Sequence, residues 1–248
     1  MNPFRQIIKA VLSRTLPAHQ LLVRGPSKPQ TNAAELATQQ PARTVELSLT
    51  FDDGPHHEHT GRLLDYLAAC EIHATFFVVG QLARQHPRLV RRIVNEGHEL
   101  GNHTFTHGKP SATSANQFLK EIRQTRALLQ DLTGRDCKLV RPPLGKLTLG
   151  KFWGLMREEL TIVLWNVDPR DYAMRSKREM ERWCESYVPA DGDILLMHDN
   201  HEFSGAAVAM FPNLPVLEDV RFVRVSEWLS AEPCVAGQRP SGEPVAQV

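Results

Sequence analysis

Two aspartates and two histidines stand at spacings that could bind a metal ion and activate water. Asp52 and Asp53 are adjacent, and His103 and His107 follow about fifty residues later, four positions apart. Two imidazoles four apart face the same side in a helical turn, and with one carboxylate they supply three ligands of the kind that catalytic zinc uses, leaving a position open for water. The second aspartate can then act as a base. Alone, Asp-Asp-Gly is more often a turn and His-x-x-x-His more often structural, but their combination favours a metal-dependent hydrolase.

These residues need elements that bring them together, and a strand–helix repeat provides such elements. Seven short, mostly apolar segments predict strands that are buried on both faces. They are Val45–Thr50, Ala74–Val79, Glu99–Asn102, Lys138–Arg141, Thr161–Asn166, Asp193–His198 and Arg221–Val225. This alternation of strands and helices is typical of a parallel sheet that is closed or covered by helices.

Apolar stripes between these segments predict the helices. One stripe runs from Leu63 to Cys70, and a second runs from Leu89 to Val94 and ends near a glycine. The longest stripe carries Phe118, Ile122 and Leu129, with Ser114 placed to cap its start and Gly134 placed to end it.

The polar residues of interest come at the ends of predicted strands. The two aspartates follow the first strand, His103 the third and Asp168 and Asp171 the fifth, while Arg141 ends the fourth and His198 the sixth. In a barrel of parallel strands, the carboxyl ends meet at one rim, so we expect these side chains to lie together. Neighbouring residues on an extended strand face oppositely, so a turn at Gly54-Pro55 is expected to direct both aspartates to the rim. A leaving amine needs an acid, and we assign that role to His198.

Five blocks in this order resemble the polysaccharide deacetylases with a NodB homology domain, carbohydrate esterase family 4. The blocks are TFDDGP (50–55), ATFFVVG (74–80), GHELGNHTFTH (97–107), RPPLG (141–145) and LLMH (195–198). The resemblance covers roughly Val45 to Trp228. It implies a distorted (β/α) barrel with about seven parallel strands.

The resemblance also implies a metal centre and a base. Asp53, His103 and His107 would bind one divalent metal ion, and Asp52 would be the general base. This ligand set suits Zn²⁺ but also accommodates Co²⁺, Ni²⁺ or Mn²⁺.

Further roles are implied around that centre. His198 would be the general acid, Arg141 would orient the base, and the backbone N–H of Leu144 would help to hold the oxyanion. An aspartate after the fifth strand would tune His198, and we choose Asp171 rather than Asp168. A carboxylate beside an imidazole favours the protonated form that can donate.

Two positions depart from the family pattern. Leu144 stands where the family usually has an aromatic residue, and Tyr172 stands where it tends to have Trp. Because Tyr172 and Leu196 would line the pocket for the acetyl methyl group, the acyl specificity could differ. We expect His56, His57 and His59 to lie in a polar loop rather than in the site, and leave His201 unassigned.

Composition restricts the partners and the compartment. Lys and Arg number 29 against 28 Asp and Glu, which argues against nucleic acid as a partner. The four cysteines are scattered, without a C-x-x-C pair that would suggest a thiolate metal site. The chain has neither a membrane-spanning apolar stretch nor the apolar core of a signal peptide, so we expect a cytoplasmic protein.

The N-terminal part differs from the rest of the chain. Its first 34 residues carry five basic and no acidic side chains. Residues 4–14 have the spacing of an amphipathic helix, which either packs on its own domain or rests on an anionic membrane surface. We therefore predict an N-terminal extension and linker at 1–42, a deacetylase domain at 43–230 and a C-terminal tail at 231–248.

Three functions are compatible with these patterns. The first is removal of the N-acetyl group from N-acetylhexosamine units of a polysaccharide, an oligosaccharide or a lipid-linked glycan. The second is hydrolysis of another amide, formyl or non-sugar, at the same metal site. The third is a catalytically inactive glycan-binding module, which the presence of all the candidate site residues disfavours.

Overall fold

The fold is built around one parallel sheet. The computed structural model describes residues 16–27 and 44–230. In the described part, eight strands pair in the order β1-β6-β5-β4-β3-β2-β7, with β8 also beside β2. The strands are β1 (Leu21–Leu22), β2 (Val45–Asp52), β3 (Thr75–Val78), β4 (Glu99–Asn102), β5 (Leu139–Val140), β6 (Thr161–Val163), β7 (Asp193–His198) and β8 (Val220–Phe222).

The sheet curls into a barrel that its ladders do not fully close. Strands β1 and β7 stand at the two ends of the order. Beyond the end of β6, Val167 makes a single parallel bridge to Leu195 in β7, and the N–H of Gly25 donates to the carbonyl of Gly192 at 2.7 Å. Because a regular barrel has a continuous ladder around its circumference, the molecule is a distorted (β/α) barrel, and the predicted fold class is confirmed.

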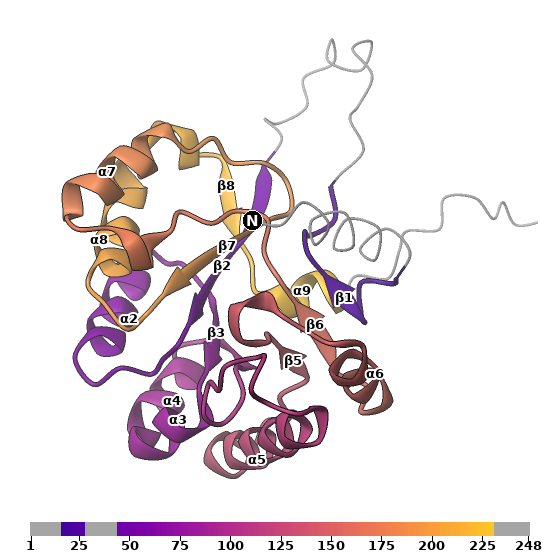
Figure 1. Ribbon diagram of the computed structural model, residues 1–248. Helices are drawn as coiled ribbons and strands as arrows, with labels where there is room; N and C mark the ends of the chain where they lie inside the picture. The colour runs from indigo at the N-terminus through magenta and orange to yellow at the C-terminus, as the bar shows by residue number, and fades with distance from the viewer. Residues whose placement is uncertain (1–15, 28–43, 231–248) are drawn as a thin grey trace, which may run out of the picture.

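Helices surround the strands (Figure 1). They are α2 (His59–Ala69), α3 (Gly80–Gln85), α4 (Pro87–Asn95), α5 (Ala115–Thr133), α6 (Leu149–Arg157), α7 (Lys177–Ser186), α8 (Phe203–Met210) and α9 (Val225–Ser230). The long helix α5 begins and ends where the sequence predicts. The Ser114 hydroxyl accepts a hydrogen bond from the N–H of Gln117 at 3.2 Å, and Gly134 ends the helix with φ 71°.

Alternation along the strands produces two apolar layers. On β2, the buried Leu47, Leu49 and Phe51 pack in the cluster that lies under the helices. Inside the barrel, Phe77 from β3 packs in a separate cluster with Trp228 of α9. Parallel strands that are covered on both sides are mostly apolar on both sides, as observed here.

Strand ends differ from the prediction in several places. The second, fourth, fifth and seventh strands are shorter than predicted at one or both ends, the first extends two residues further, to Asp52, and Val225 begins α9 instead of ending a strand. Ladder pairing defines a strand end, and pairing depends on neighbours that are distant in sequence. Leu21 and Leu22 fall in the stretch assigned to the N-terminal extension, yet they pair in register with Ile162 and Val163. The predicted helix at 4–14 and the tail at 231–248 lie outside the described residues.

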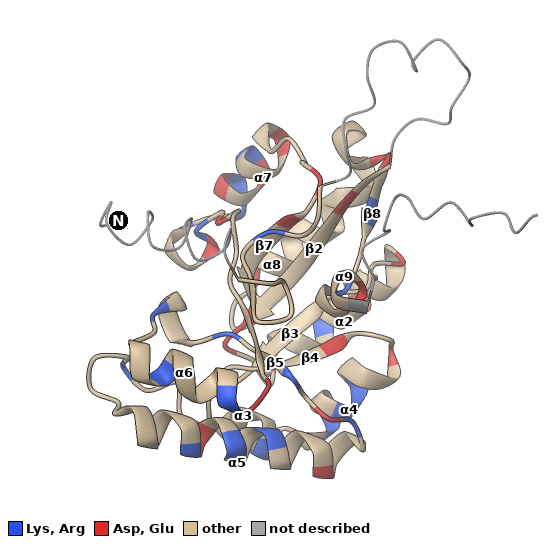
Figure 2. Ribbon diagram, turned by 90° about the vertical axis from the view of Figure 1, so that its right-hand side faces the viewer, with Lys and Arg blue, Asp and Glu red and all other residues tan. Residues whose placement is uncertain are grey.

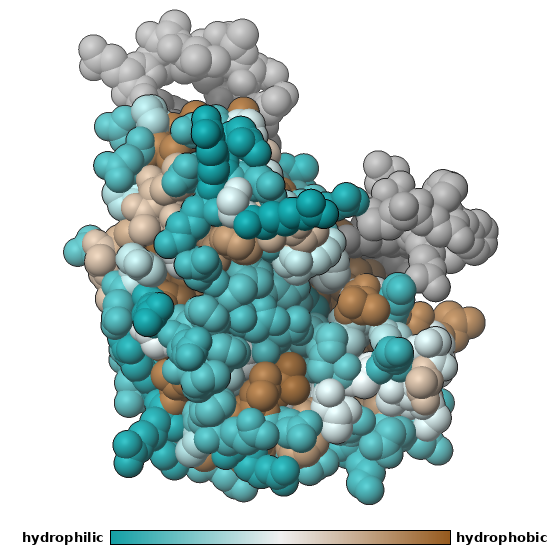
Figure 3. All heavy atoms as spheres, turned by 60° about the vertical axis from the view of Figure 1, so that its left-hand side comes forward, coloured by the Kyte–Doolittle hydropathy of each residue, from teal (hydrophilic) through white to brown (hydrophobic). Residues whose placement is uncertain are grey.

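The surface carries mixed charge. Basic and acidic residues are interspersed along α5 and α7, whereas α4 carries arginines and no acidic residue (Figure 2). The face in Figure 3 is mostly hydrophilic, with separate hydrophobic patches. Within residues 16–27 and 44–230, no helix combines the length and apolar character that crossing a bilayer requires.

Candidate active site

The two aspartates reach the rim by different backbone geometry. Asp52 is the last residue of β2 and is 4% exposed, and its strand register pairs it with His198 on β7. Asp53 follows with φ 71°, in the left-handed region. The sequence predicts that the Gly54-Pro55 turn directs both carboxylates, whereas in the structure Asp53 itself makes the turn. Such a backbone conformation is uncommon for a residue other than glycine and is concentrated at functional sites.

Asp53, His103 and His107 form a group that could hold a metal ion. Their ligand atoms lie within 4.8 Å of one another. Asp53 Oδ1 is 3.2 Å from His107 Nε2 and 3.4 Å from His103 Nε2. This oxygen is buried and makes no hydrogen bond with any described residue. A buried carboxylate oxygen without a donor, faced by two imidazole nitrogens, fits a divalent cation.

The sequence pattern predicts that the two histidines converge through a helical turn. In the structure they converge through a loop instead. His103 follows the end of β4 in a loop, where Thr104 has φ 66° and His107 has φ 53°. The N–H of His107 donates to the Thr104 hydroxyl at 3.1 Å. Two left-handed residues therefore turn both rings to the same side.

The backbone orients one ring of this group. His103 is 2% exposed, and its Nδ1 lies 2.6 Å from the carbonyl oxygen of Arg141. That contact places the proton on Nδ1, which leaves the Nε2 lone pair directed at Asp53. Although burial raises the pKa of Asp53, the neighbouring imidazoles of His103 and His107 outweigh it and lower the pKa to about 2. Asp53 is therefore ionised at neutral pH.

Arg141 supports the other aspartate. Its side chain is fully buried, and Nη1 donates to Asp52 Oδ1 at 2.8 Å and to the Thr50 hydroxyl at 2.7 Å. Its Nε and Nη2 donate to the carbonyls of Val163 and Leu164. These hydrogen bonds fix the guanidinium, which in turn fixes the orientation of the buried Asp52 carboxylate.

His198 and Asp171 form a second charged pair at the rim. His198 Nδ1 lies 2.8 Å from Asp171 Oδ1, and Asp171 is fully buried. Burial lowers the pKa of His198, but the hydrogen bond to Asp171 and the charge of that carboxylate outweigh this effect and raise the pKa to about 9. Asp168 instead accepts the N–H of Arg170 at 2.9 Å in an exposed turn. The structure thus places the chosen aspartate against His198.

Asp199 is a site residue that the sequence analysis misses. It is 1% exposed, and it accepts the Thr60 hydroxyl at 2.8 Å through Oδ2. Burial, followed by the charges of Asp53 and Asp52, raises the pKa of Asp199 to about 7 although the Thr60 hydrogen bond opposes this. A Cβ on Gly54 would lie 2.0 Å from its carboxylate oxygens. The available signals were an acid directly after His198 and a glycine after the two aspartates, but neither shows that they touch.

His201 faces the far side of Asp171. Its Nε2 lies 3.5 Å from Asp171 Oδ2, while its Nδ1 accepts the N–H of Phe203 at 3.3 Å. Asp171, His198 and His201 also have the composition of a metal site. However, the hydrogen bonds place a proton on each imidazole nitrogen that faces Asp171, so both rings present donors rather than lone pairs. His201 Nε2 makes no hydrogen bond with any described residue, so within this group the imidazole hydrogen bond to Asp171 comes from His198.

The remaining predicted residues lie around the rim or beneath it. Leu144 has φ 56° in a short turn at 143–145 and its side chain is 60% exposed. The ring of Tyr172 meets His198 edge-on, with centroids 5.3 Å apart. Leu196 is buried. His56 and His57 are in ring contact, and the side chain of His57 is 62% exposed, consistent with a solvated loop.

Comparison with known proteins identifies the family. The model of the family described as polysaccharide deacetylase matches residues 39–155. A peptidoglycan-N-acetylglucosamine deacetylase of Bacillus cereus is 33% identical over 188 residues, which are 74% of this chain and 87% of that protein. The chain belongs to the polysaccharide deacetylase family. A second B. cereus protein of the same name is 37% identical over 132 residues, or 53% of this chain and 48% of that protein. The chain therefore spans about half the length of this longer polysaccharide deacetylase.

A solved structure agrees with the family assignment. The peptidoglycan deacetylase PdaC of Bacillus subtilis is 31% identical, with a TM-score of 0.68 over 77% of this chain and 92% of that one. The distorted barrel is thus shared with a polysaccharide deacetylase of known structure. Deacetylases of this family depend on a metal ion, and the Asp53 group is a candidate for holding it.

Proposed function

We propose that this protein hydrolyses the N-acetyl group of N-acetylhexosamine units in a glycan, releasing acetate and a free amine. One observation carries the proposal: a metal-ligand group, Asp53 with two histidines, lies beside a separate buried carboxylate, Asp52, which is paired with the protonated His198 on the neighbouring strand. The names of the B. cereus and B. subtilis relatives support a glycan substrate.

The residues divide the chemistry between them. A divalent ion held by Asp53, His103 and His107 would polarise the acetyl carbonyl and acidify a water molecule. Asp52, held in place by the hydrogen bond from Arg141, accepts the proton of the attacking water. The N–H of Leu144 assists in stabilising the negative charge on the former carbonyl oxygen.

The breakdown step needs a proton on the leaving nitrogen. His198 holds one at neutral pH because Asp171 raises its pKa to about 9 against the effect of burial. Donation from its Nε2 leaves the Nδ1 proton hydrogen-bonded to Asp171. Base and acid are thus separate groups on neighbouring strands.

We propose Zn²⁺ as the metal, because two imidazoles and one carboxylate form a ligand set typical of catalytic zinc. Co²⁺, Ni²⁺ and Mn²⁺ are accommodated by the same donors. Metal analysis of the purified protein, followed by chelation and reconstitution with each ion, tests this assignment.

The function is tested by acetate release from N-acetylglucosamine oligomers, peptidoglycan fragments and lipid-linked N-acetylated glycans. Wild type loaded with metal should release acetate from at least one of them, and Asp52→Asn should bind the metal and release almost none. A wild type that binds metal and a glycan tightly but deacetylates none of these substrates would support the inactive-module alternative.

Two positions in the site support the alternative function, in which the enzyme removes an acyl group other than acetyl. Tyr172 lies against the ring of His198, and Leu144 occupies the turn that follows two prolines. Tyr in place of Trp at position 172 would alter the shape of the acyl pocket, and Leu in place of an aromatic residue at position 144 would alter the packing of the substrate. Product analysis that distinguishes acetate from formate, with matched N-acetyl and N-formyl substrates, separates the two hydrolase functions.

We also propose that residues 4–14 contact an anionic membrane surface, on the basis of their sequence pattern alone. Co-sedimentation with anionic liposomes, with and without residues 1–20, tests this contact. Equal sedimentation of both forms would contradict it.

A further inference from the structure

We propose that Glu121 is a positioning residue for the metal ligand His107, acting through the loop that carries both histidines. This inference rests on the proposed metal site at Asp53, His103 and His107. Glu121 belongs to α5, which makes none of the catalytic contacts described above. Glu121 is nevertheless only 5% exposed. A glutamate is rarely buried unless its carboxylate is paired, so its hydrogen-bond partners indicate its role.

The carboxylate of Glu121 is hydrogen-bonded to Thr106, the residue immediately before His107. Its Oε2 accepts two hydrogen bonds from Thr106, one from the backbone N–H at 2.9 Å and one from the hydroxyl at 2.9 Å. Its Oε1 accepts the side-chain amide of Gln117 at 3.2 Å. Hydrogen bonds to a charged acceptor are stronger than neutral ones, so the backbone at Thr106 is held firmly.

The loop needs such a hold because its backbone is unfavourable. Thr104 has φ 66° and His107 has φ 53°, and residues other than glycine rarely adopt these values. Such conformations persist only where the surroundings determine them. The Thr104 N–H donates to Asn102 Oδ1 at 3.0 Å, so one side of the loop is fixed to β4 and the other side is fixed to α5.

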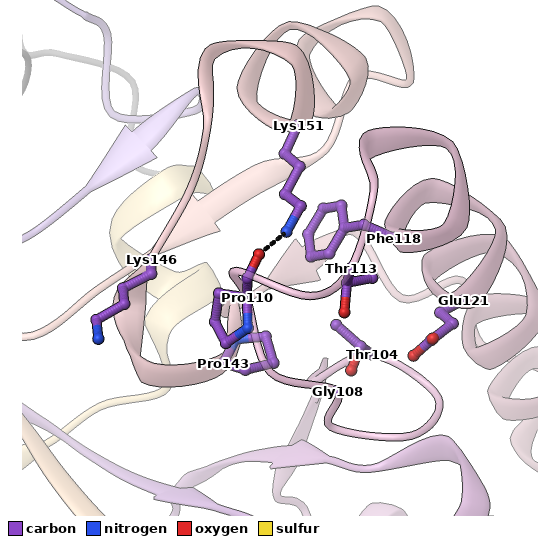
Figure 4. Close-up of a pocket in the computed structure, with 9 residues that line it drawn as sticks. All are labelled: Thr104, Gly108, Pro110, Thr113, Phe118, Glu121, Pro143, Lys146 and Lys151. Carbon is purple, nitrogen blue, oxygen red and sulfur yellow. Dashed lines mark hydrogen bonds between the residues drawn. The ribbon is translucent and has the colours of Figure 1, made fainter.

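A second buried charge holds the loop beyond His107. Lys151 on α6 is 1% exposed, and its Nζ donates to the carbonyl of Pro110 at 2.8 Å. The ammonium also lies 5.3 Å from the centre of the Phe118 ring. Figure 4 shows Lys151 and Glu121 lining the same small pocket behind Thr104, with the Lys151–Pro110 bond dashed. Two helices thus tether the loop from behind through oppositely charged, buried side chains.

This arrangement has a direct consequence for the metal ligands. His103 is oriented by the Arg141 carbonyl and is almost fully buried, whereas the side chain of His107 is 32% exposed. The position of His107 therefore depends more on its loop. Groups that orient a ligand typically change metal affinity by about 10- to 100-fold when removed.

The test compares Zn²⁺ affinity, measured by competition with a chelator, in the full chain and its variants. Glu121→Ala should raise the dissociation constant about 10- to 100-fold. Glu121→Gln keeps an acceptor for Thr106 and should recover most of the affinity. Asp131→Ala removes an exposed acid from the same helix and should leave the affinity unchanged. Thr106→Val removes only one of the two hydrogen bonds and should cause a smaller loss.

A double-mutant cycle separates positioning from general destabilisation. In a His107→Ala background, adding Glu121→Ala should cause little further loss of affinity, because the ligand that it positions is already gone. Melting of the metal-free variants reports any purely structural effect. Wild-type affinity in Glu121→Ala, or the same fold loss in both backgrounds, would overturn the inference. Failure of the wild type to bind Zn²⁺ would instead overturn the proposed metal site, and the inference with it.

Discussion

His198 and Asp171 are joined by a 2.8 Å contact between Nδ1 and Oδ1, and the same carboxylate accepts the backbone N–H of His198 at 2.7 Å. Asp171 therefore fixes both the orientation of the imidazole and the position of its proton. The second contact matters because it ties the carboxylate to β7, so the pair moves as a unit.

The first prediction concerns the pH dependence of turnover. The pKa of His198 is about 9, above its ordinary value of 6.5, chiefly because Asp171 overcomes the effect of burial. A general acid works only while protonated, so activity should fall as the pH rises through this value. Asp171→Asn removes the raising charge and should move the alkaline limb of kcat/KM down by about 1 to 3 pH units. Asp168→Asn is the control and should leave the limb in place.

The second prediction separates the roles of the candidate ligands and base. His103→Ala and His107→Ala should lose most of the bound metal, because each removes one of three ligands. Asp52→Asn should retain the metal and lose turnover by about 10²- to 10⁴-fold. Metal content and acetate release are measured on the same preparations. Equal metal loss in all three variants would refute this division.

The third prediction concerns the buried Arg141–Asp52 pair. Arg141→Met leaves the carboxylate of Asp52 buried without its partner and should destabilise the protein by about 3–5 kcal/mol in denaturant unfolding. Adding Asp52→Asn should recover part of that loss. The partly exposed Arg126, paired with Asp136, offers a comparison, and Arg126→Met should cost about 0.2–1 kcal/mol. If Arg141→Met and Arg126→Met lower the free energy of unfolding by similar amounts, burial of the Arg141–Asp52 pair does not explain the loss.

The fourth prediction tests the close approach of Gly54 to Asp199. A methyl group at Gly54 would overlap the Asp199 carboxylate, so Gly54→Ala should destabilise the protein by about 1–3 kcal/mol. Asp199→Gly in the same chain should relieve part of the overlap. At Gly61 in α2, an added Cβ would meet its nearest atom at an ordinary 3.7 Å, so Gly61→Ala should be neutral or stabilising. Thermal melting compares the variants.

Local pattern in the sequence determined much of this molecule. Periodicity predicted the strand–helix alternation, and Ser114 and Gly134 marked the ends of α5 because capping and left-handed termination act within a few residues. The ordered blocks predicted which polar residues belong to the rim, since carboxyl ends of parallel strands converge.

Other features of the fold and site were decided by the tertiary structure alone, because these features depend on contacts between residues that are distant in sequence. Asp168 and Asp171 are similar in sequence context, and only desolvation against α8 and His198 distinguishes the buried acid from the exposed one. Leu21 and Leu22 show no strand pattern of their own and become β1 by pairing with β6. Likewise, no periodicity links Asp199 to Gly54 or Glu121 to Thr106. Burial and hydrogen bonding across the barrel give these residues their places, and neither is encoded in local spacing.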